Sequence, residues 1–264
     1  MRLAEIPCKV DHAIRFKSFT ITPALYLSSL VERLTALGGR LHRLYVPSLE
    51  YLTSPQCLAL YGSAPAAIVN CTGLGSLTLG GVEDSKLFPT RGQVVRVHAP
   101  WIRTGWTRQV GSLDGGEGGE RTYVIPRCTG DVILGGTREI GDWTPFPRAE
   151  TARDILQRTQ DICPELVPEH LRVNTCQTIR GLHHALFEGG GEVRGPLDGI
   201  VKEHLVGFRP SREGGTRLER EERAIGGKRV TVVHNYGHGG AGWQSSWGCA
   251  VDVVSLLEGR PAKL

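Results

Sequence analysis

The sequence predicts an α/β part interleaved with an α+β part, the latter built on a mainly antiparallel β-sheet. The α/β part is indicated by strand and helix signals that alternate before residue 70 and recur near the C-terminus. The antiparallel part is indicated by short strands, glycine-rich loops and hairpin turns between Gln93 and about Phe146. At 264 residues and 40% apolar, the chain can bury a substantial core, as one large domain or as two interleaved ones.

The front of the chain predicts a strand, a helix and two further strands. Apolar and polar residues alternate over Phe16–Ile21, which predicts a strand. Thr22 and Pro23 then provide a cap and a first-turn proline for a helix that Gly38 and Gly39 end. Short strands are predicted over residues 40–46 and 67–70.

The middle of the chain gives weaker signals. A helix is predicted over residues 151–162, where Cys163 and Pro164 end it. The loop at residues 114–119 is rich in glycine, and we expect it to be a simple surface loop rather than a mobile cover. Residues 173–203 have little periodicity, as expected of an insertion, a disordered loop or a misassembled coding sequence, and we assign them no function.

Composition excludes several classes of protein. The net charge is only +4, and the 31 basic residues are scattered among 27 acidic ones, so nucleic-acid binding is not expected. No segment is long and apolar enough to span a bilayer and no secretory signal opens the chain, so we expect a soluble intracellular protein. The 7 cysteines form no C-x-x-C pair, so neither a disulfide framework nor a metal site is expected.

The most informative segment lies near the C-terminus. The β-branched run Val230–Val233 leads into a glycine-dense turn at residues 237–242 and then into an apolar helix. Bare backbone N–H groups beside a helix N-terminus suit the close approach of an anionic cofactor. Taken alone, such a turn could equally be a tight left-handed turn without a ligand.

Six segments, in this order along the chain, resemble the D-amino-acid oxidase family of FAD-dependent enzymes, which includes D-aspartate oxidase. The resemblance covers most of residues 15–255. The segments that carry it are Ala67–Gly75, Arg91–Val94, Tyr123–Arg127, Gly135–Trp143, Val206–Pro210 and His234–Ala250.

The resemblance implies a Rossmann-like FAD-binding domain, N-terminally truncated and interleaved with a substrate domain. Residues 1–90 would be the remnant of the FAD-binding domain, 91–228 the substrate domain, and 229–264 the last strand and helix of the FAD-binding domain. The front lacks the strand, the G-x-G-x-x-G turn and the acidic residue with which family members open. About a hundred residues would be lacking by comparison with the family. We therefore expect either a truncated gene model or a fragment that holds FAD poorly and exposes apolar surface.

The resemblance also implies the reaction and its residues. Family members deaminate D-amino acids oxidatively, with FAD and O₂, to 2-oxo acids, ammonia and hydrogen peroxide. Arg209 would grip the substrate α-carboxylate, Tyr123 would share it, and the Gly240 carbonyl would receive the amino group. No side chain need act as a catalytic acid or base, because the flavin takes the hydride. The predicted flavin contacts are Val69, Thr72, Gly73, Gly239, Gly240, Ala241, Gly242, Trp243 and Gln244.

Substrate preference depends on Arg138, which by resemblance would pair with the side-chain carboxylate of an acidic D-amino acid. Alternatively it points to solvent or pairs with Asp142. Arg108 is a second candidate cation. We favour a broad D-amino-acid oxidase over the alternative, a D-aspartate oxidase. The sequence is also compatible with a non-catalytic remnant without flavin and with a glycine- or sarcosine-type oxidase.

The chain ends in Ala262-Lys263-Leu264, which resembles the S-K-L type of peroxisomal address. An oxidase that forms hydrogen peroxide has a physical reason to lie beside catalase, so we expect a peroxisomal protein recognised by the import receptor. A homodimer is also compatible with the family resemblance.

Overall fold

The computed structural model describes residues 10–111, 120–172 and 195–262. These residues form two compact units. Unit 1 takes the described residues within 10–40, 92–138 and 145–207, and unit 2 takes those within 41–91, 139–144 and 208–262. The predicted loop at 114–119, most of the irregular stretch at 173–203, and Lys263 and Leu264 lie outside the described residues.

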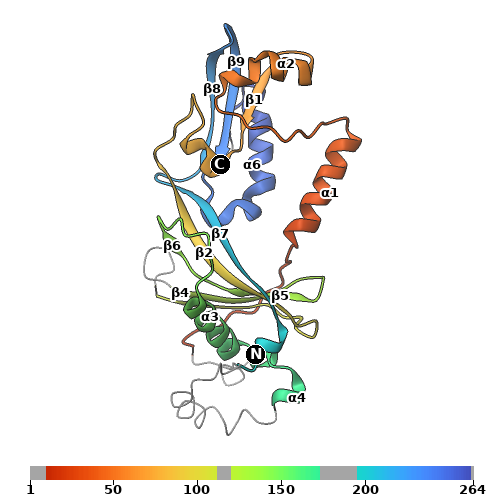
Figure 1. Ribbon diagram of the computed structural model, residues 1–264, viewed down its shortest axis with the longest axis vertical. Helices are drawn as coiled ribbons and strands as arrows, with labels where there is room; N and C mark the ends of the chain where they lie inside the picture. Colours follow the sequence, from red (N-terminus) through yellow and green to blue (C-terminus); the bar gives the residue numbers. More distant parts are fainter. Residues whose placement is uncertain (1–9, 112–119, 173–194, 263–264) are drawn as a thin grey trace. The chain divides into compact units, whose positions relative to one another are not determined.

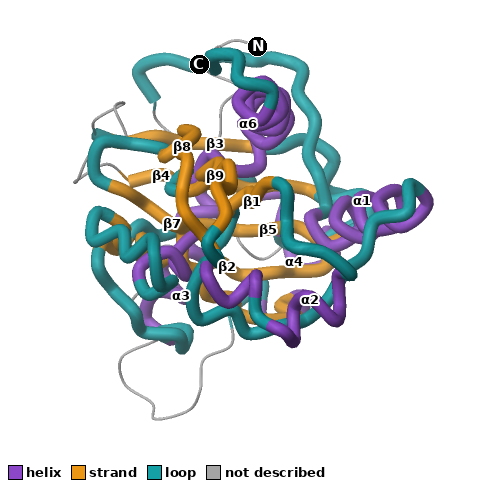
Figure 2. The backbone as a smooth tube through the Cα atoms, turned by 90° about the horizontal axis from the view of Figure 1, so that it is seen from above, coloured by secondary structure: helices purple, strands orange, loops and turns teal. Residues whose placement is uncertain are grey.

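Unit 2 contains a three-stranded sheet in the order β1 (Ala67–Asn70), β9 (Lys228–Tyr236), β8 (Arg217–Ile225). Strands β1 and β9 are parallel, and β8 and β9 are antiparallel. Figures 1 and 2 show helix α6 (Gly242–Leu257) beside β8 and β9, against which it packs. The short helix α2 (Pro55–Tyr61) is capped by Ser54, whose hydroxyl accepts from the Cys57 backbone N–H.

Unit 1 is built on antiparallel strands. The sheet order is β3 (Trp106–Val110), β4 (Glu120–Pro126), β5 (Asp131–Gly135), β2 (Leu87–His98), β6 (Glu139–Ile140), and β7 (Val201–Arg212) also pairs with β2. Of these strands, β6 belongs to unit 2. Strands β2 and β7 are long enough to contribute residues to both units.

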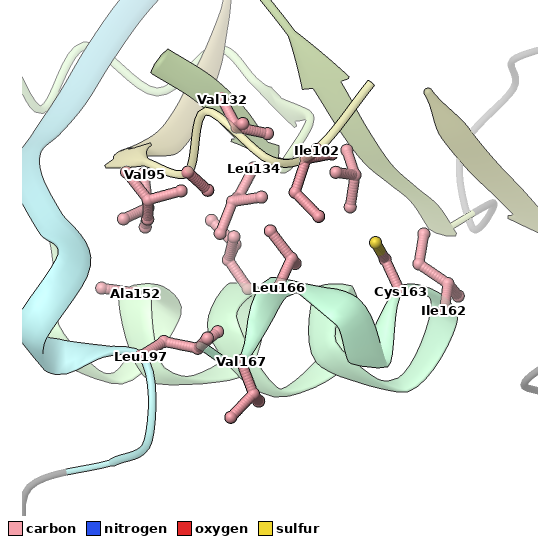
Figure 3. Packing of buried hydrophobic residues seen from close by; sticks show 14 residues of the cluster. Val95, Ile102, Val132, Leu134, Ala152, Ile162, Cys163, Leu166, Val167 and Leu197 are labelled. Carbon is pink, nitrogen blue, oxygen red and sulfur yellow. The ribbon is translucent and has the colours of Figure 1, made fainter. Parts of the chain in front are cut away.

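Helix α3 (Ala149–Ile162) covers β4 and β5. Figure 3 shows the resulting core, in which Val95 of β2 and Leu134 of β5 belong to one buried cluster with Ala152 of α3. Among the described residues, two further α-helices are α1 (Pro23–Ala36), which buries none of its residues, and α4 (Glu169–Arg172).

Several predicted elements are confirmed, and two are wrong. The helices predicted from Pro23 and over residues 151–162, the strand over 67–70 and the C-terminal strand and helix are present. Residues 16–21 and 40–46 are not strands. Within the described part of the chain these two segments pair with no strand, and Phe16 and Phe19 are 77% and 87% exposed. Alternation predicts a strand only where another strand completes the ladder.

The two units also group the chain differently from the predicted segments 1–90, 91–228 and 229–264. The described residues before Arg40 belong with the antiparallel unit, where the Thr20 hydroxyl donates to the Pro126 carbonyl at 2.8 Å and Arg127 donates to the Ile21 carbonyl. Residues 208–228 belong with unit 2, because β8 pairs along its whole length with β9.

Unit 2 exposes apolar surface, as expected from the front of the sequence. Strand β1 lies at the edge of its sheet, and its Val69 is 41% exposed. On α6, four exposed apolar residues at helical spacing face away from the side that packs on the sheet: Trp243, Trp247, Val251 and Val254. Among the described residues, no helix is long and apolar enough to cross a membrane, and no cluster of His, Cys, Asp or Glu could hold a metal ion.

Candidate functional site

The parallel pairing of β1 with β9 brings two predicted cofactor segments to one edge of the sheet. Asn70, the last residue of β1, lies opposite His234 of β9. The turn that begins at Cys71 and the glycine turn at residues 237–242 therefore both leave the carboxyl end of this strand pair. In α/β sheets, ligands bind outside the carboxyl ends of the strands.

The end of β7 lies against both turns. A Cβ atom built on Gly73 would lie 3.6 Å from Cβ of Pro210, and one built on Gly239 would lie 3.4 Å from Oγ of Ser211. A Cβ atom on Gly240 would lie 3.5 Å from Cδ of Arg209. The structure thus brings Arg209 together with two of the predicted flavin-contacting turns within unit 2.

The glycine turn leaves its backbone accessible. Gly237 and Gly239 adopt φ of +86° and +55°, a region that favours glycine. One 3₁₀ turn (Gly239–Ala241) then leads into α6, and no side chain of the described residues caps the first N–H groups of this helix. Gly240, Ala241, Trp243 and Gln244 are exposed. The residues present therefore fit one edge of a flavin, since they offer glycine backbone beside the N-terminus of a helix.

Sequence reasoning missed a spacing in this turn. The turn between β9 and α6 contains the G-x-G-x-x-G spacing, formed by Gly237, Gly239 and Gly242. The sequence prediction considered this spacing only for the front of the chain. The pattern alone is a weak signal, but its position at the carboxyl edge of β9 gives it the structural context of a cofactor turn.

Arg209 is half-buried and anchored near the start of unit 2's part of β7. Its Nη1 donates to the backbone carbonyl of Arg91 at 3.4 Å. Arg91 itself is fully buried, donates through Nε to the Thr144 carbonyl at 2.7 Å, and forms an ion pair with Glu139. Arg91 therefore ties β2 to the segment 139–144 behind Arg209. The sequence contained Arg91 in a family-like motif but did not reveal this supporting role.

A second buried network holds the end of β7 beside the end of β9. Asp84 receives hydrogen bonds from Arg212 Nε at 2.7 Å and from the Tyr236 hydroxyl at 2.9 Å. Burial alone would raise the pKa of Asp84, but these two hydrogen bonds lower it on balance. The charged carboxylate thus links Arg212, three residues after Arg209, to Tyr236, which precedes the glycine turn.

His238, inside the glycine turn, contacts helix α6. Its Nε2 lies 3.4 Å from Sγ of the buried Cys249 on α6. Burial lowers the pKa of His238, so the imidazole stays neutral at physiological pH.

The remaining predicted residues lie in unit 1. Tyr123 on β4 pairs with Gly135 on β5, and a Cβ atom on Gly135 would lie only 2.2 Å from Cζ of Tyr123. The phenol ring therefore lies directly on the backbone at Gly135 and Gly136, where no larger residue fits. Arg138 follows shortly after and is exposed.

Sequence reasoning missed Arg158 of α3, which is nearly buried beside Tyr123's strand. Its Nη1 donates to the Thr122 hydroxyl at 2.7 Å, and its Nε to Asp154 at 2.8 Å. Arg108, the second candidate cation, donates to Glu120 at 3.3 Å, while its buried Nε has no hydrogen-bond partner among the described residues. Polar residues of β3, β4 and α3 thus form one charged cluster in unit 1.

A strand, glycine turn and helix at the carboxyl edge of a parallel strand pair are typical of α/β proteins that bind a nucleotide cofactor. The family model described as "DAO: FAD dependent oxidoreductase" matches residues 2–256. The chain therefore belongs to the DAO family of FAD-dependent oxidoreductases, as its resemblance predicted.

Individual relatives refine this membership. D-aspartate oxidase from Cryptococcus neoformans var. grubii is 52% identical over 258 residues, which are 96% of this chain and 65% of the relative. D-amino-acid oxidase from Fusarium vanettenii is 34% identical, over 96% of this chain and 62% of the relative. The chain thus spans slightly less than two-thirds of the length of either protein.

A solved structure supports the fold. The crystal structure of glycine oxidase from Geobacillus kaustophilus matches with a TM-score of 0.50 over 76% of this chain and 44% of that one. At 18% sequence identity this likeness concerns the fold alone. It agrees with the predicted combination of an α/β part with an antiparallel sheet.

Proposed function

We propose that this chain is an FAD-dependent oxidase of acidic D-amino acids, with D-aspartate as its preferred substrate. The sequence alone favoured a broad D-amino-acid oxidase, with this function as the alternative. The 52% identity to a D-aspartate oxidase, against 34% to a D-amino-acid oxidase, favours the alternative. The single structural observation that supports an oxidase site is Arg209 beside Gly240 at the carboxyl edge of the parallel strands.

Each proposed residue has a distinct task. Arg209, half-buried beside the glycine turn, would hold the substrate α-carboxylate through two parallel charge-assisted hydrogen bonds. The Gly240 carbonyl would accept from the substrate amino group. Tyr123 and Arg138 are assigned by the family resemblance, the first to the α-carboxylate and the second to the side-chain carboxylate.

The protein's contribution is binding and orientation. FAD, when bound, accepts the hydride from the substrate α-carbon and is reoxidised by O₂, which becomes hydrogen peroxide. The flavin edge would lie on Thr72, Gly73 and the glycine turn, with the N-terminus of α6 favouring negative charge there. Hydrolysis of the released imino acid then gives the 2-oxo acid and ammonia.

Replacing Arg138 with leucine should raise the KM for D-aspartate by about 10- to 30-fold, while the KM for D-alanine changes less than about twofold. The expected loss corresponds to about 1.5 to 2 kcal/mol, because an exposed cation is partly screened by water. The measurement is hydrogen peroxide formation by flavin-loaded protein with each substrate. Arg103→Leu, at another exposed position of unit 1, is the matched control. Equal losses on both substrates would contradict the assignment.

A second candidate function is a non-catalytic chain that associates with a partner and holds no flavin. The specific observation in its favour is the exposed apolar stripe on α6 together with the edge position of β1. Retention of FAD by the purified chain would exclude it. Activity on N-methylglycine but on no D-amino acid would instead favour a sarcosine-type oxidase.

We also propose a peroxisomal location, supported by the terminal Ala262-Lys263-Leu264. Its last two residues lie outside the described residues. A fluorescent protein fused ahead of this chain should colocalise with catalase, and the same fusion without Leu264 should not. Identical distributions of the two fusions would contradict the proposal.

A further inference from the structure

Behind the turn after β1 lies a chain of hydrogen bonds, buried at its centre, that the proposed reaction does not use. It runs from Thr72 through Asn70 and His234 to Glu221. Asn70 and His234 are both buried, on neighbouring strands of the parallel pair. Polar side chains are costly at such positions unless each hydrogen bond is made.

The backbone N–H of Thr72 can only donate, and this fixes the orientation of the Asn70 amide. The backbone N–H of Thr72 donates to Asn70 Oδ1 at 3.1 Å, and the Thr72 hydroxyl donates to the same oxygen at 2.8 Å. Since this fixes the amide oxygen of Asn70 toward Thr72, its Nδ2 must face the other way. There Nδ2 lies 3.1 Å from Ser76 Oγ and 3.2 Å from His234 Nδ1.

The amide of Asn70 in turn fixes the tautomer of His234. Because Nδ2 can only donate, His234 Nδ1 must accept and carries no proton. The single ring proton then lies on Nε2, which is 2.8 Å from Glu221 Oε1 and donates to it. Glu221 is held as a carboxylate by Arg223, whose Nε lies 2.6 Å away. The amide of Asn70 and the ring of His234 are thus both satisfied in this arrangement, while the hydroxyls of Thr72 and Ser76, 2.7 Å apart, can share a further hydrogen bond.

We propose that His234 is a positioning residue that, as the neutral Nε2–H tautomer, holds Asn70 in the orientation that fixes the Thr72 turn. The inference rests on the proposed function only in taking this turn to be a flavin contact. If His234 carried a second proton, on Nδ1, two donors would face each other and Asn70 would have to rotate. Rotation would remove both hydrogen bonds from Thr72.

The charges around His234 are compatible with the neutral form. Burial lowers the pKa of its imidazole, Glu221 raises it, and Arg217 lowers it. Glu219 and Arg223 also lie on β8, and the ring of Tyr236 on β9 packs edge-on at 5.8 Å between centroids. The hydrogen-bond geometry, rather than this balance, carries the inference.

The first test is the protonation state of His234 in the flavin-free 264-residue chain labelled with ¹⁵N-histidine. Long-range ¹H–¹⁵N spectra at neutral pH should show a resonance pair with an unprotonated Nδ1 and a protonated Nε2. This pair should vanish in His234→Asn, which assigns it. A protonated Nδ1 on His234 would overturn the proposal.

The second test is amide hydrogen exchange, read at Thr72 relative to Val232 on the core strand β9. In His234→Leu the buried Nδ2 of Asn70 loses one of its two acceptors, so exchange at Thr72 should quicken by about tenfold or more relative to Val232. In His234→Asn an amide oxygen can take the place of Nδ1, so Thr72 should recover most of its protection. Parallel changes at both amides in His234→Leu would indicate general destabilisation and overturn the positioning role.

A third variant remains informative even if His234→Leu does not fold. In Asn70→Asp the carboxylate can accept from both Thr72 and His234, so His234 should stay doubly protonated to higher pH than in the unchanged chain. An unaltered titration of His234 would overturn the proposal. FAD affinity is measured separately, so a chain with the expected tautomer and Thr72 protection but without FAD binding would support the positioning role while contradicting the proposed function.

Discussion

Replacing Arg91 with methionine should lower the free energy of unfolding by about 3 kcal/mol, measured by urea denaturation. Arg91 is fully buried on β2, and its guanidinium satisfies both Glu139 and the Thr144 carbonyl. Methionine fills much of the same volume but leaves the carbonyl without its donor and the carboxylate without its counter-ion. Because the Glu139 side chain is 30% exposed, water recovers part of the loss, so we place the effect at the lower end of the range for buried pairs.

Arg96→Met provides the matched control on the same strand. Arg96 pairs with Asp131 and Glu203, but its side chain is 38% exposed, so its loss should cost less than about 1 kcal/mol. Equal destabilisation by the two substitutions would contradict the role that we give to Arg91 behind the candidate site.

Replacing Arg209 with alanine should raise the KM of flavin-loaded protein for every D-amino acid by about a hundredfold or more. All these substrates share the α-carboxylate, and loss of two charge-assisted hydrogen bonds in a half-buried site costs about 3 kcal/mol or more. The effect should be as large for D-alanine as for D-aspartate, which separates it from the effect of Arg138→Leu.

Steady-state kinetics with both substrates measure the effect of Arg209→Ala. Arg220→Ala, at an arginine of β8 that pairs with Glu222 near the surface, should leave KM unchanged. Arg209→Lys should recover only part of the loss, because an ammonium group lacks the planar fork that matches a carboxylate. An unaltered KM in Arg209→Ala would remove Arg209 from substrate binding.

Local patterns predicted the helices well and the strands less well. After Pro23, apolar residues recur at helical spacing, and the structure forms α1 over them: Leu27, Leu30, Val31 and Leu34. Apolar and polar residues alternate only in part over residues 16–21, where Phe16 and Phe19 are three positions apart, and the segment has no ladder within the described residues. Alternation of apolar and polar residues indicates which side chains would share one face of a strand, but it does not show whether a neighbouring strand is present to pair with it.

The candidate site was predictable in part, and chiefly through resemblance. Spacing alone does not show that the turn after Asn70 lies beside the turn after Tyr236, since Asn70 and His234 are 164 positions apart in the sequence. The polar residues behind these turns were missed for the same reason. A single asparagine, histidine or buried arginine within an apolar strand predicts a hydrogen bond, but its partner is set by the tertiary fold.

The polar residues that sequence reasoning missed were nevertheless visible in the sequence, as polar exceptions within apolar strands. Asn70 and His234 interrupt apolar runs, and Arg91 stands in a strand whose other inward residues are mostly apolar. Because a buried polar group must be satisfied, each exception marks a position where the fold brings a distant partner. Such residues lie directly behind the turns proposed to hold the flavin.

The visible absorption spectrum of the purified 264-residue chain, freed of excess FAD and recorded before and after anaerobic D-aspartate, tests the central claim most directly. We predict a retained flavin band that D-aspartate bleaches faster than D-alanine does at equal concentration. A chain that retains no flavin band, or one whose band no D-amino acid bleaches, would contradict the proposal that this chain carries out D-amino-acid oxidation.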